Sequence, residues 1–518
     1  MKPSSVAVFA FAGMLLTSLS VYSFTPKGGL ASTAKVEVTA EKNDEVKPIE
    51  DKTEQTIQTD LAHFTAGSTV MIDGRLGHSK VLRNNAGETF LMLEARSSND
   101  GRAKSAAPVN LSIVIDRSGS MKGTRLRNAI NAAIGAVERL KDGDMVSVVT
   151  FDTRTQVVVP SSIISSSSRN SVVSAISSIQ LGGDTCLSCG IETGMAEMSL
   201  TTGGDARISR MIVLSDGDAN HGLRDIPGFR SLAQRARDKN ISISTVGVDV
   251  DYNERILSAI SVESNGRHYF VENDTALARI FEGEAESLTQ AIASGAEVEV
   301  ELGAGVELDR VFDRTFRRNG NRITVPLGTF SNGDVKTILM KVRLPTSSSD
   351  SVAVASVDMR YRDLVKNEEG HCTGKLGVSI VDSGASDLDG VVAGRVNRSE
   401  TAATLKEANL LFAQGKVEEA RRRIQSRESA LRDNLEKAKS AAPAARADDV
   451  AKDFDKQLAA VQQAESGFNS PFAEPPPPPG AGGVFATPPA AAAPAPVEAR
   501  QGKRQVRANE AAATDMGF

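Results

Sequence analysis

The feature of this sequence that most constrains its fold is a regular alternation of apolar strands and amphipathic helices between residues 106 and 294. Near-continuous apolar runs such as "VNLSIVI", "MVSVVTF" and "ISISTVGV" have the composition of strands that are buried on both faces. Between them, stretches such as "TRLRNAINAAIGAVERL" place apolar residues at helical spacing. This alternation predicts an α/β domain built on a doubly wound, mostly parallel sheet.

The segments on either side of this region have the two-residue period of β-strands. Residues 60–105 form a strand-rich lead-in, and residues 295–383 contain further alternating runs between Gly, Asn, Ser and Pro turns. We expect the second segment to form a β-sandwich-like domain. Pairing between the strands of the two segments is an alternative, because the chain leaves the α/β region and then returns to β structure.

The C-terminal part is predicted to be helical and then irregular. Residues 398–468 have helical periodicity with a break at "AQGK", and they are predicted to form a helical hairpin. Residues 470–518 are rich in Pro and Ala and then basic, which predicts a disordered tail with a stiff proline run.

The N-terminus has the pattern of an exported protein. Lys2 precedes an apolar run within residues 1–24, which is typical of a signal peptide or of an uncleaved membrane anchor. The sequence leaves cleavage open, and residues 25–58 then form a polar linker. We therefore expect a protein that is periplasmic, at the cell surface or secreted, and that touches a membrane only through this N-terminal segment.

The composition argues against nucleic acid as a partner. The 518 residues include 60 Lys and Arg against 65 Asp and Glu, for a formal net charge of -5. Aromatic residues make up 4% of the chain and Trp is absent, so stacking platforms for single strands are not expected.

Oxygen-bearing side chains gather where three of the predicted loops begin. Asp116 follows the strand "VNLSIVI", and Ser118 and Ser120 come after it at two-residue spacing. Thr185 lies in "GGDT" just before a helix, and Asp216 ends the strand of "VLSDGD". Ligands of such folds bind outside the carboxyl ends of the strands. Taken alone, Asp-x-Ser-x-Ser is also compatible with a helix N-cap, but the matching threonine and aspartate favour a shared site.

This set of side chains has the chemistry of a metal site. Two carboxylates and three hydroxyls, without nitrogen or sulfur, suit a hard divalent cation such as Mg²⁺. Hydroxyls are neutral ligands, so an ion held largely by them stays incompletely neutralised. Such an ion attracts an anionic oxygen from outside, which gives the site a physical reason to capture a carboxylate of a partner.

The motif resembles the metal-ion-dependent adhesion site of the von Willebrand factor type A (VWA) domain. The family pattern is Asp-x-Ser-x-Ser, then a threonine in a Gly-rich loop, then an aspartate in an Asp-Gly motif that ends a strand. Here these motifs read "DRSGS", "GGDTCLSCG" and "LSDGDAN", and all five positions match. The flanking β segments are more weakly similar to those of a group of exported bacterial proteins.

The resemblance implies a Rossmann-like sheet with one antiparallel edge strand. It also implies a bound Mg²⁺, with Mn²⁺ or Ca²⁺ as alternatives, and a protein partner whose exposed Asp or Glu completes the coordination of the ion. The metal ligands that it implies are Asp116, Ser118, Ser120, Thr185 and Asp216.

The cysteines depart from the family pattern. Many relatives have Asn after the threonine, where this chain has Cys186, and Cys189 follows one helical turn later. In an oxidising compartment a close pair is usually a disulfide, which here would stiffen the Thr185 loop. Free thiols, or a redox pair activated by a helix N-terminus, are the alternatives. Cys372 is left over if the first two are paired.

The sequence shows no nucleophile system of an enzyme. Gly-x-Ser-x-Gly, His-Glu-x-x-His and the phosphate-binding loop are all missing from it. We therefore expect a non-enzymatic, exported adhesion or scaffold protein that binds its partner through the metal. An envelope assembly or chaperone-like factor is the alternative. A hydrolase that uses metal-bound water, with His221 as the base, is a third hypothesis.

Overall fold

The computed structural model describes most of the chain beyond the predicted linker. The described residues are 56–97, 107–200, 207–216, 219–249, 252–271, 274–347, 350–468 and 497–517. The predicted signal peptide or anchor at 1–24 lies outside them, as do almost all of the predicted linker and residues 470–496 of the predicted tail. Within the described part, no helix is both long and apolar enough to span a bilayer.

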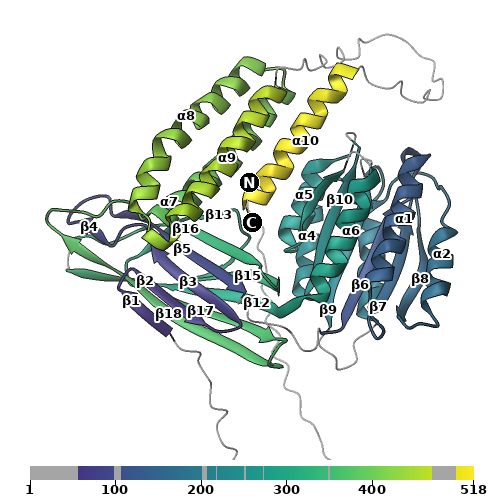
Figure 1. Ribbon diagram of the computed structural model, residues 1–518, viewed down its shortest axis with the longest axis horizontal. Coiled ribbons are helices and arrows are strands. Elements are labelled where there is room, and N and C mark those ends of the chain that lie inside the picture. The colour runs from purple at the N-terminus through teal and green to yellow at the C-terminus, as the bar shows by residue number, and fades with distance from the viewer. Residues whose placement is uncertain are drawn as a thin grey trace, which may run out of the picture. The chain divides into compact units, whose positions relative to one another are not determined.

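A six-stranded sheet forms the centre of the α/β region, in the order β11-β10-β9-β6-β7-β8 (Figure 1). Its strands are β6 (Val109–Asp116), β7 (Met145–Phe151), β8 (Thr155–Ile163), β9 (Ile208–Ser215), β10 (Ile241–Val248) and β11 (His268–Val271). All neighbours in this sheet are parallel except β8, which pairs antiparallel with β7 at one edge. The predicted doubly wound, mostly parallel sheet is confirmed, together with the antiparallel edge strand that the family resemblance implies.

Helices pack on both faces of this sheet. They are α1 (Thr124–Arg139), α2 (Arg169–Ser177), α3 (Leu187–Ser199), α4 (Ile226–Asp238), α5 (Glu254–Glu263) and α6 (Asp274–Thr289). On one face Ile113 and Ile115 of β6 share a core with Phe281 of α6. On the other face Val114 shares a second core with Phe229 of α4. Successive residues of β6 thus enter opposite cores, which explains why the strand is buried along its length.

The β segments before and after the α/β region form two further sheets, in the orders β1-β2-β3-β5-β16-β13 and β14-β15-β12-β17-β18-β4. The first segment supplies β1 (Thr56–Asp60), β2 (His63–Gly67), β3 (Val70–Leu76), β4 (Lys80–Leu82) and β5 (Glu88–Ser97). The second segment supplies β12 (Ala291–Leu302), β13 (Glu307–Phe312), β14 (Arg317–Asn319), β15 (Arg322–Ser331), β16 (Val335–Arg343), β17 (Ser351–Asp363) and β18 (Glu368–Val381).

These two segments build one sandwich. β5 pairs antiparallel with β16, with Glu88 opposite Arg343, and β4 pairs in parallel with β18. A single core contains Phe64 from the first segment together with Val300 and Ile338 from the second. The pairing that the sequence left as an alternative is therefore the observed one. Residues 295–383 supply part of a sandwich, and the α/β domain is inserted between β5 and β12.

Three consecutive helices follow the sandwich, where the sequence predicts a hairpin. They are α7 (Gly390–Ala413), α8 (Val417–Ala441) and α9 (Ala447–Gly467). The side chain of Asp389 accepts hydrogen bonds from the first amides of α7 and fixes its start. Gly415, with a φ of 79°, lies at the predicted break and separates α7 from α8. The break thus ends one helix and starts another, which adds a third helix to the predicted pair.

Helix α10 (Val497–Gly517) forms where the sequence predicts a disordered tail. Ala513 and Met516 are buried in the same core as Phe412 of α7. Arg507 is paired with Glu254 of α5. The alanine-rich end of the chain has high helix propensity, and an apolar stripe lets it pack. The proline run that precedes this helix favours an irregular chain, but the prediction of disorder is wrong for Val497–Gly517.

Candidate metal centre

The two predicted carboxylates lie side by side at the carboxyl edge of the central sheet. Asp116 is the last residue of β6, and Asp216 directly follows β9. These strands are adjacent and parallel, with Ile115 opposite Leu214. Asp116 is 0% exposed and Asp216 is 1% exposed. The structure thus brings both carboxylates together at the edge where ligands bind in sheets of this type.

The two predicted serines connect these carboxylates through hydrogen bonds. The main-chain N–H of Ser118 donates to Asp116 Oδ1 at 2.8 Å, and the hydroxyl oxygens of Ser118 and Ser120 are 3.0 Å apart. Ser120 Oγ donates to Asp216 Oδ1 at 2.6 Å. The turn that follows β6 therefore places two hydroxyls beside two carboxylates, so four of the five predicted ligands form one bonded group.

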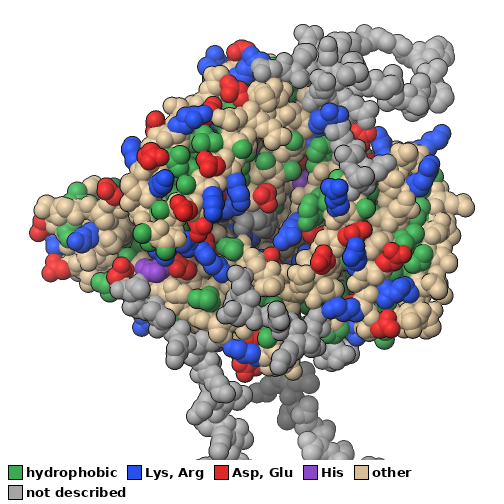
Figure 2. All heavy atoms as spheres, in the orientation of Figure 1, with side chains coloured by type: hydrophobic (Ala, Val, Ile, Leu, Met, Phe, Trp, Pro, Cys, Tyr) green, Lys and Arg blue, Asp and Glu red, His purple; other side chains and the backbone are tan. Residues whose placement is uncertain are grey.

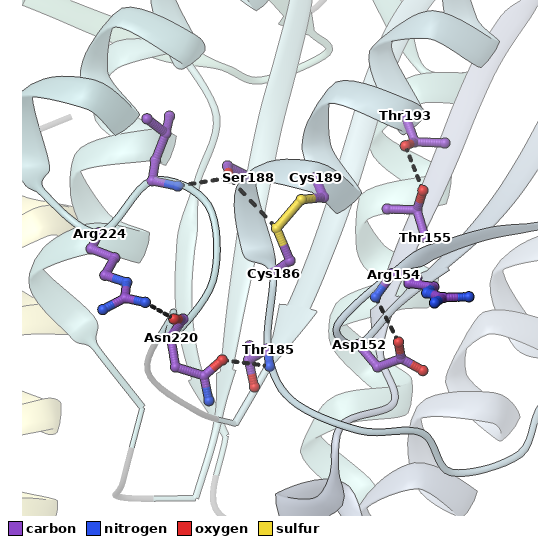
Figure 3. Close-up of a disulfide and its surroundings, with 11 residues drawn as sticks. Asp152, Arg154, Thr155, Thr185, Cys186, Ser188, Cys189, Thr193, Asn220 and Arg224 are labelled. Carbon is purple, nitrogen blue, oxygen red and sulfur yellow. Dashed lines mark hydrogen bonds between the residues drawn. A yellow bond between two sulfur atoms is a disulfide. The ribbon is translucent and has the colours of Figure 1, made fainter.

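Thr185 lies on a neighbouring loop, between α2 and α3. Its main-chain N–H donates to Asn220 Oδ1 at 2.8 Å (Figure 3). Its carbonyl oxygen accepts from the N–H groups of Asn220 and His221, each at 3.1 Å. The same loop meets the serine turn, because Gly119 N donates to Gly183 O at 2.9 Å. Main-chain contacts therefore hold Thr185 next to the serine turn.

The glycines of "GGDT" make this close approach sterically feasible. A Cβ atom on Gly182 would lie 1.8 Å from Asp152 Oδ2, and one on Gly183 would lie 2.7 Å from Thr153 Oγ1. Asp152 is held in place by Arg117, 2.8 Å away. The loop can lie against these side chains only where it lacks Cβ atoms.

A disulfide joins Cys186 to Cys189 at the start of α3 (Figure 3). Of the three states that the sequence left open for this pair, the structure contains the disulfide. Cys186 N also donates to Asp152 O at 2.8 Å, so the residue after Thr185 is anchored by its main chain as well. Cys372 is buried in β18, in the core of the sandwich.

Burial penalises the charge of both carboxylates. It raises the pKa of Asp116 to about 6, although hydrogen bonds from Ser118 and Ser215 act in the opposite direction. Burial also raises the pKa of Asp216, against the hydrogen bond from Ser120 and the charge of Arg125. The two carboxylates repel each other in addition. A bound cation would stabilise their ionised forms, so the electrostatics of the site fit a metal ion.

The donor set also fits a hard divalent cation. Every predicted ligand offers oxygen, which Mg²⁺, Mn²⁺ and Ca²⁺ prefer over nitrogen or sulfur. Among the described residues, no group of three or more His, Cys, Asp or Glu side chains is arranged to hold a metal. The hydroxyl groups of Ser118 and Ser120 are further oxygens beside Asp116 and Asp216.

Four further residues belong to this site, and sequence reasoning missed them. Arg125 pairs with Asp216 and with Asp249, Ser215 bonds to Asp116, and Asn220 holds Thr185. Asp249 follows the apolar strand β10, so the strand-end rule that located Asp216 could have found it. The other three carry no such signal, because their contacts come from residues distant in sequence.

His221, the base of the hydrolase hypothesis, lies at the rim of the site. Its ring Nε2 is 3.2 Å from Asp184 Oδ2, and the side chains of His221 and Asp184 are 45% and 62% exposed. The ring is therefore engaged by a surface carboxylate.

The fold and the site together define an α/β domain with an oxygen-rich cluster at the carboxyl edge of its parallel sheet. Residues 110–283 match the family model described as von Willebrand factor type A domain. This match identifies residues 110–283, rather than the whole chain, as a VWA domain.

Comparison with curated proteins gives distant relatives. An uncharacterized protein from Synechocystis sp. is 26% identical over 49% of this chain and 62% of its own length. The uncharacterized protein YfbK from Escherichia coli is 26% identical over 39% of this chain and 35% of its own length. Inter-alpha-trypsin inhibitor heavy chain H3 from Mesocricetus auratus is 23% identical over 52% of this chain and 30% of its own. The chain thus spans less than two thirds of the length of these relatives.

Among the solved structures that match, two share the fold over most of this chain. A von Willebrand factor type A protein from Catenulispora acidiphila superposes with a TM-score of 0.63 at 15% identity, over 80% of this chain and 91% of its own. The ArnB paralog VWA2 from Sulfolobus acidocaldarius has a TM-score of 0.50 at 17% identity, over 76% of this chain and 98% of its own. At these identities the likeness shows the fold alone.

Proposed function

We propose that this protein is an exported, metal-dependent adhesion or scaffold protein whose VWA domain captures a carboxylate of a protein partner. The VWA domain supports a role in protein interaction in general. The finer proposal rests on one observation, the hydrogen-bonded group that Ser118, Ser120 and Asp216 form beside Asp116.

In this proposal the chain supplies an incomplete shell around a divalent cation, which we take to be Mg²⁺, with Mn²⁺ or Ca²⁺ as alternatives. Ser118, Ser120 and Thr185 offer neutral oxygens, while Asp116 and Asp216 act directly or through water. Ser120 is exposed, whereas both aspartates are buried. Ser120 would therefore hold the ion where an Asp or Glu of the partner could reach it from solvent and complete the coordination.

The surface favours recognition at such a local site. Figure 2 shows acidic and basic side chains interspersed over the visible face of the molecule. On that face no large area of one sign is available to attract a charged macromolecule by its overall field. A concentrated charge at a metal ion would give the specificity that such a mixed surface lacks.

We propose binding rather than hydrolysis because the arrangement around His221 does not favour a general base. A base must reach the proton that it removes, directly or through one water molecule. The His221 ring is instead bonded to the exposed Asp184, on the outer side of the Thr185 loop.

Calorimetric titration of the full chain with Mg²⁺, Mn²⁺ and Ca²⁺ tests the metal site. Asp216→Ala should abolish saturable binding while circular dichroism shows a retained fold. Asp142→Asn is the matched control, because it changes an exposed carboxylate in the turn before β7, at the opposite edge of the sheet. Undiminished binding by Asp216→Ala would refute the assignment. Ser120→Ala gives a second test if Asp216→Ala is poorly folded, since Ser120 is exposed.

Localisation distinguishes adhesion from the envelope assembly alternative. Adhesion requires the VWA domain to be reachable by protease or antibody on intact cells. An assembly factor in the periplasm would be reached only after the outer barrier is opened. A pull-down from cell extracts with and without chelator, compared between wild type and Asp216→Ala, then reports whether partner binding depends on the metal site.

A further inference from the structure

Arg125 is a cation already present at the candidate metal centre. It is the second residue of α1, and its Nη1 donates to Asp216 Oδ2 at 2.9 Å and to the carbonyl oxygen of Ser120 at 2.9 Å. Its Nη2 donates to the carboxylate of Asp249. The guanidinium therefore bridges two carboxylates that come from the ends of different strands.

Asp249 is held in an unusual backbone conformation that serves this contact. It directly follows β10, the neighbour of β9, and its main-chain N–H donates to Val271 O at 2.9 Å. Its φ is 64°, in the left-handed region that residues other than glycine seldom adopt. The side chain of Asp249 is 10% exposed and that of Arg125 is 30% exposed. The backbone thus keeps a nearly buried carboxylate facing a guanidinium that solvent can still reach.

A divalent ion and Arg125 would act on the same carboxylate. One oxygen of Asp216 accepts from Ser120 and the other accepts from Arg125. Arginine does not lose its proton in proteins. Its guanidinium can therefore reduce its repulsion from a bound metal only by moving away or by pairing more closely with another anion. Asp249 is such an anion and is already in contact. Together the carboxylates of Asp116, Asp216 and Asp249 and one guanidinium leave two net negative charges, which a divalent cation would neutralise.

We propose that Arg125 is a resident counter-ion that lowers the metal affinity of the free protein, and that Asp249 draws it away from Asp216 when metal binds. This inference rests on the proposed metal site. Its consequence is that the ion is held weakly until the carboxylate of the partner adds a further negative charge. Metal and partner would then bind cooperatively, because each improves the site for the other.

Titration of Mg²⁺ and Mn²⁺ into the full chain and four variants tests this inference. Arg125→Met removes the competing charge and should lower the metal Kd by about tenfold, a size typical of coupling between neighbouring sites. Arg125→Lys keeps the charge and should stay near wild type. Asp249→Asn leaves Arg125 with Asp216 as its carboxylate and should raise the Kd. In the double variant Arg125→Met with Asp249→Asn, the effect of the Asn substitution should shrink, because Arg125 is no longer there to be redirected.

The outcomes separate this inference from the proposed function. An unchanged or higher Kd in Arg125→Met would overturn the inference and assign Arg125 a supporting role for the Ser120 turn. Arg125→Gln, which keeps a hydrogen-bond donor without the charge, gives the same reading if Arg125→Met is poorly folded. Equal binding by wild type and every variant refutes the counter-ion role alone. An absence of binding in all of them removes the metal site and this inference together. Thermal unfolding in chelator monitors the fold of each variant.

Discussion

Ser215 Oγ donates a hydrogen bond to Asp116 Oδ2 at 2.7 Å, and both residues are 0% exposed at the ends of neighbouring strands. This bond lowers the pKa of Asp116 and so offsets part of the effect of burial, which raises that pKa to about 6. Ser215 therefore helps to keep ionised a carboxylate that the proposed metal requires.

Ser215→Ala should lower the free energy of unfolding by about 1–3 kcal/mol, because it leaves a buried acceptor without one of its donors. It should also raise the pKa of Asp116 further, so the metal Kd should rise most at pH 6 and less at pH 8. Urea denaturation in chelator and calorimetry at the two pH values measure both effects. Ser177→Ala, an exposed hydroxyl on α2 that bonds to Val173 O, is the control. Equal behaviour of the two variants would show that Ser215 does not support the site.

Gly182→Ala should disturb the Thr185 loop. The new Cβ atom would lie 1.8 Å from Asp152 Oδ2, and Asp152 cannot give way freely because it is paired with Arg117. We expect a loss of about 1–3 kcal/mol in the free energy of unfolding, the usual cost of overpacking, and weaker metal binding. Gly283→Ala in α6 meets no atom within 4 Å, so it should stabilise the protein by up to about 1 kcal/mol. Unchanged stability of Gly182→Ala would mean that the loop relaxes without cost.

Replacing Cys186 and Cys189 together by Ser should destabilise the protein only moderately. The disulfide spans a sequence separation of 3, so the entropy that it removes from the unfolded chain is worth about 2 kcal/mol. A reducing agent should destabilise the wild type by a similar amount and leave the double variant unchanged. Thiol labelling of the native protein checks the premise. Reaction of Cys186 or Cys189 before any reduction would contradict the disulfide.

His268 should make the protein sensitive to acid. Burial lowers its pKa to about 3, and its ring nitrogens lie 2.9 Å from Thr245 Oγ1 and 3.3 Å from the hydroxyl of Tyr252. Between pH 6.5 and pH 3 the unfolded chain binds a proton at this histidine that the folded chain does not. Stability therefore falls as the pH drops through this range, by at most about 1.4 kcal/mol per pH unit from this group.

His268→Gln should flatten this dependence, whatever its effect on stability at pH 7. Urea denaturation in chelator at pH 5 and pH 7 gives the slope. Ser177→Ala, which removes an exposed hydroxyl on α2, should keep the slope of the wild type. A slope in His268→Gln that equals the wild-type slope would assign the acid sensitivity to other groups.

The α/β domain was predictable because each of its central strands has its own signature. Five of the eight residues of β6 (Val109–Asp116) are Val, Leu or Ile, and a strand of this kind must be covered on both faces. The arrangement of the sandwich was not predictable in the same way. An alternating strand shows which face is buried but not which strand lies beside it. The pairing of Glu88 with Arg343 joins segments separated by the whole VWA domain.

The residues of the site also differ in how well the sequence predicts them. Asp116 and Asp216 could be located because an acid that ends a buried strand is conspicuous. Asp249 also follows an apolar strand, β10, but it is not one of the five positions of the family pattern. Arg125 occupies the polar side of an amphipathic helix, where an arginine ordinarily faces solvent. Only the fold shows that it reaches two carboxylates from other strands.

The insertion of the VWA domain between β5 and β12 also determines how mechanical force on a bound partner would pass through the protein. The chain enters the domain just before β6 and leaves it after α6, whose end shares a core with Val109 at the start of β6. The start of β6 and the end of α6 therefore both lie at the edge of the sheet opposite Asp116. Tension on a partner held at the carboxyl edge would run along the strands and load their hydrogen bonds in shear. It would then pass to the sandwich through two covalent links that share the force, which is a stronger coupling than a single flexible linker provides.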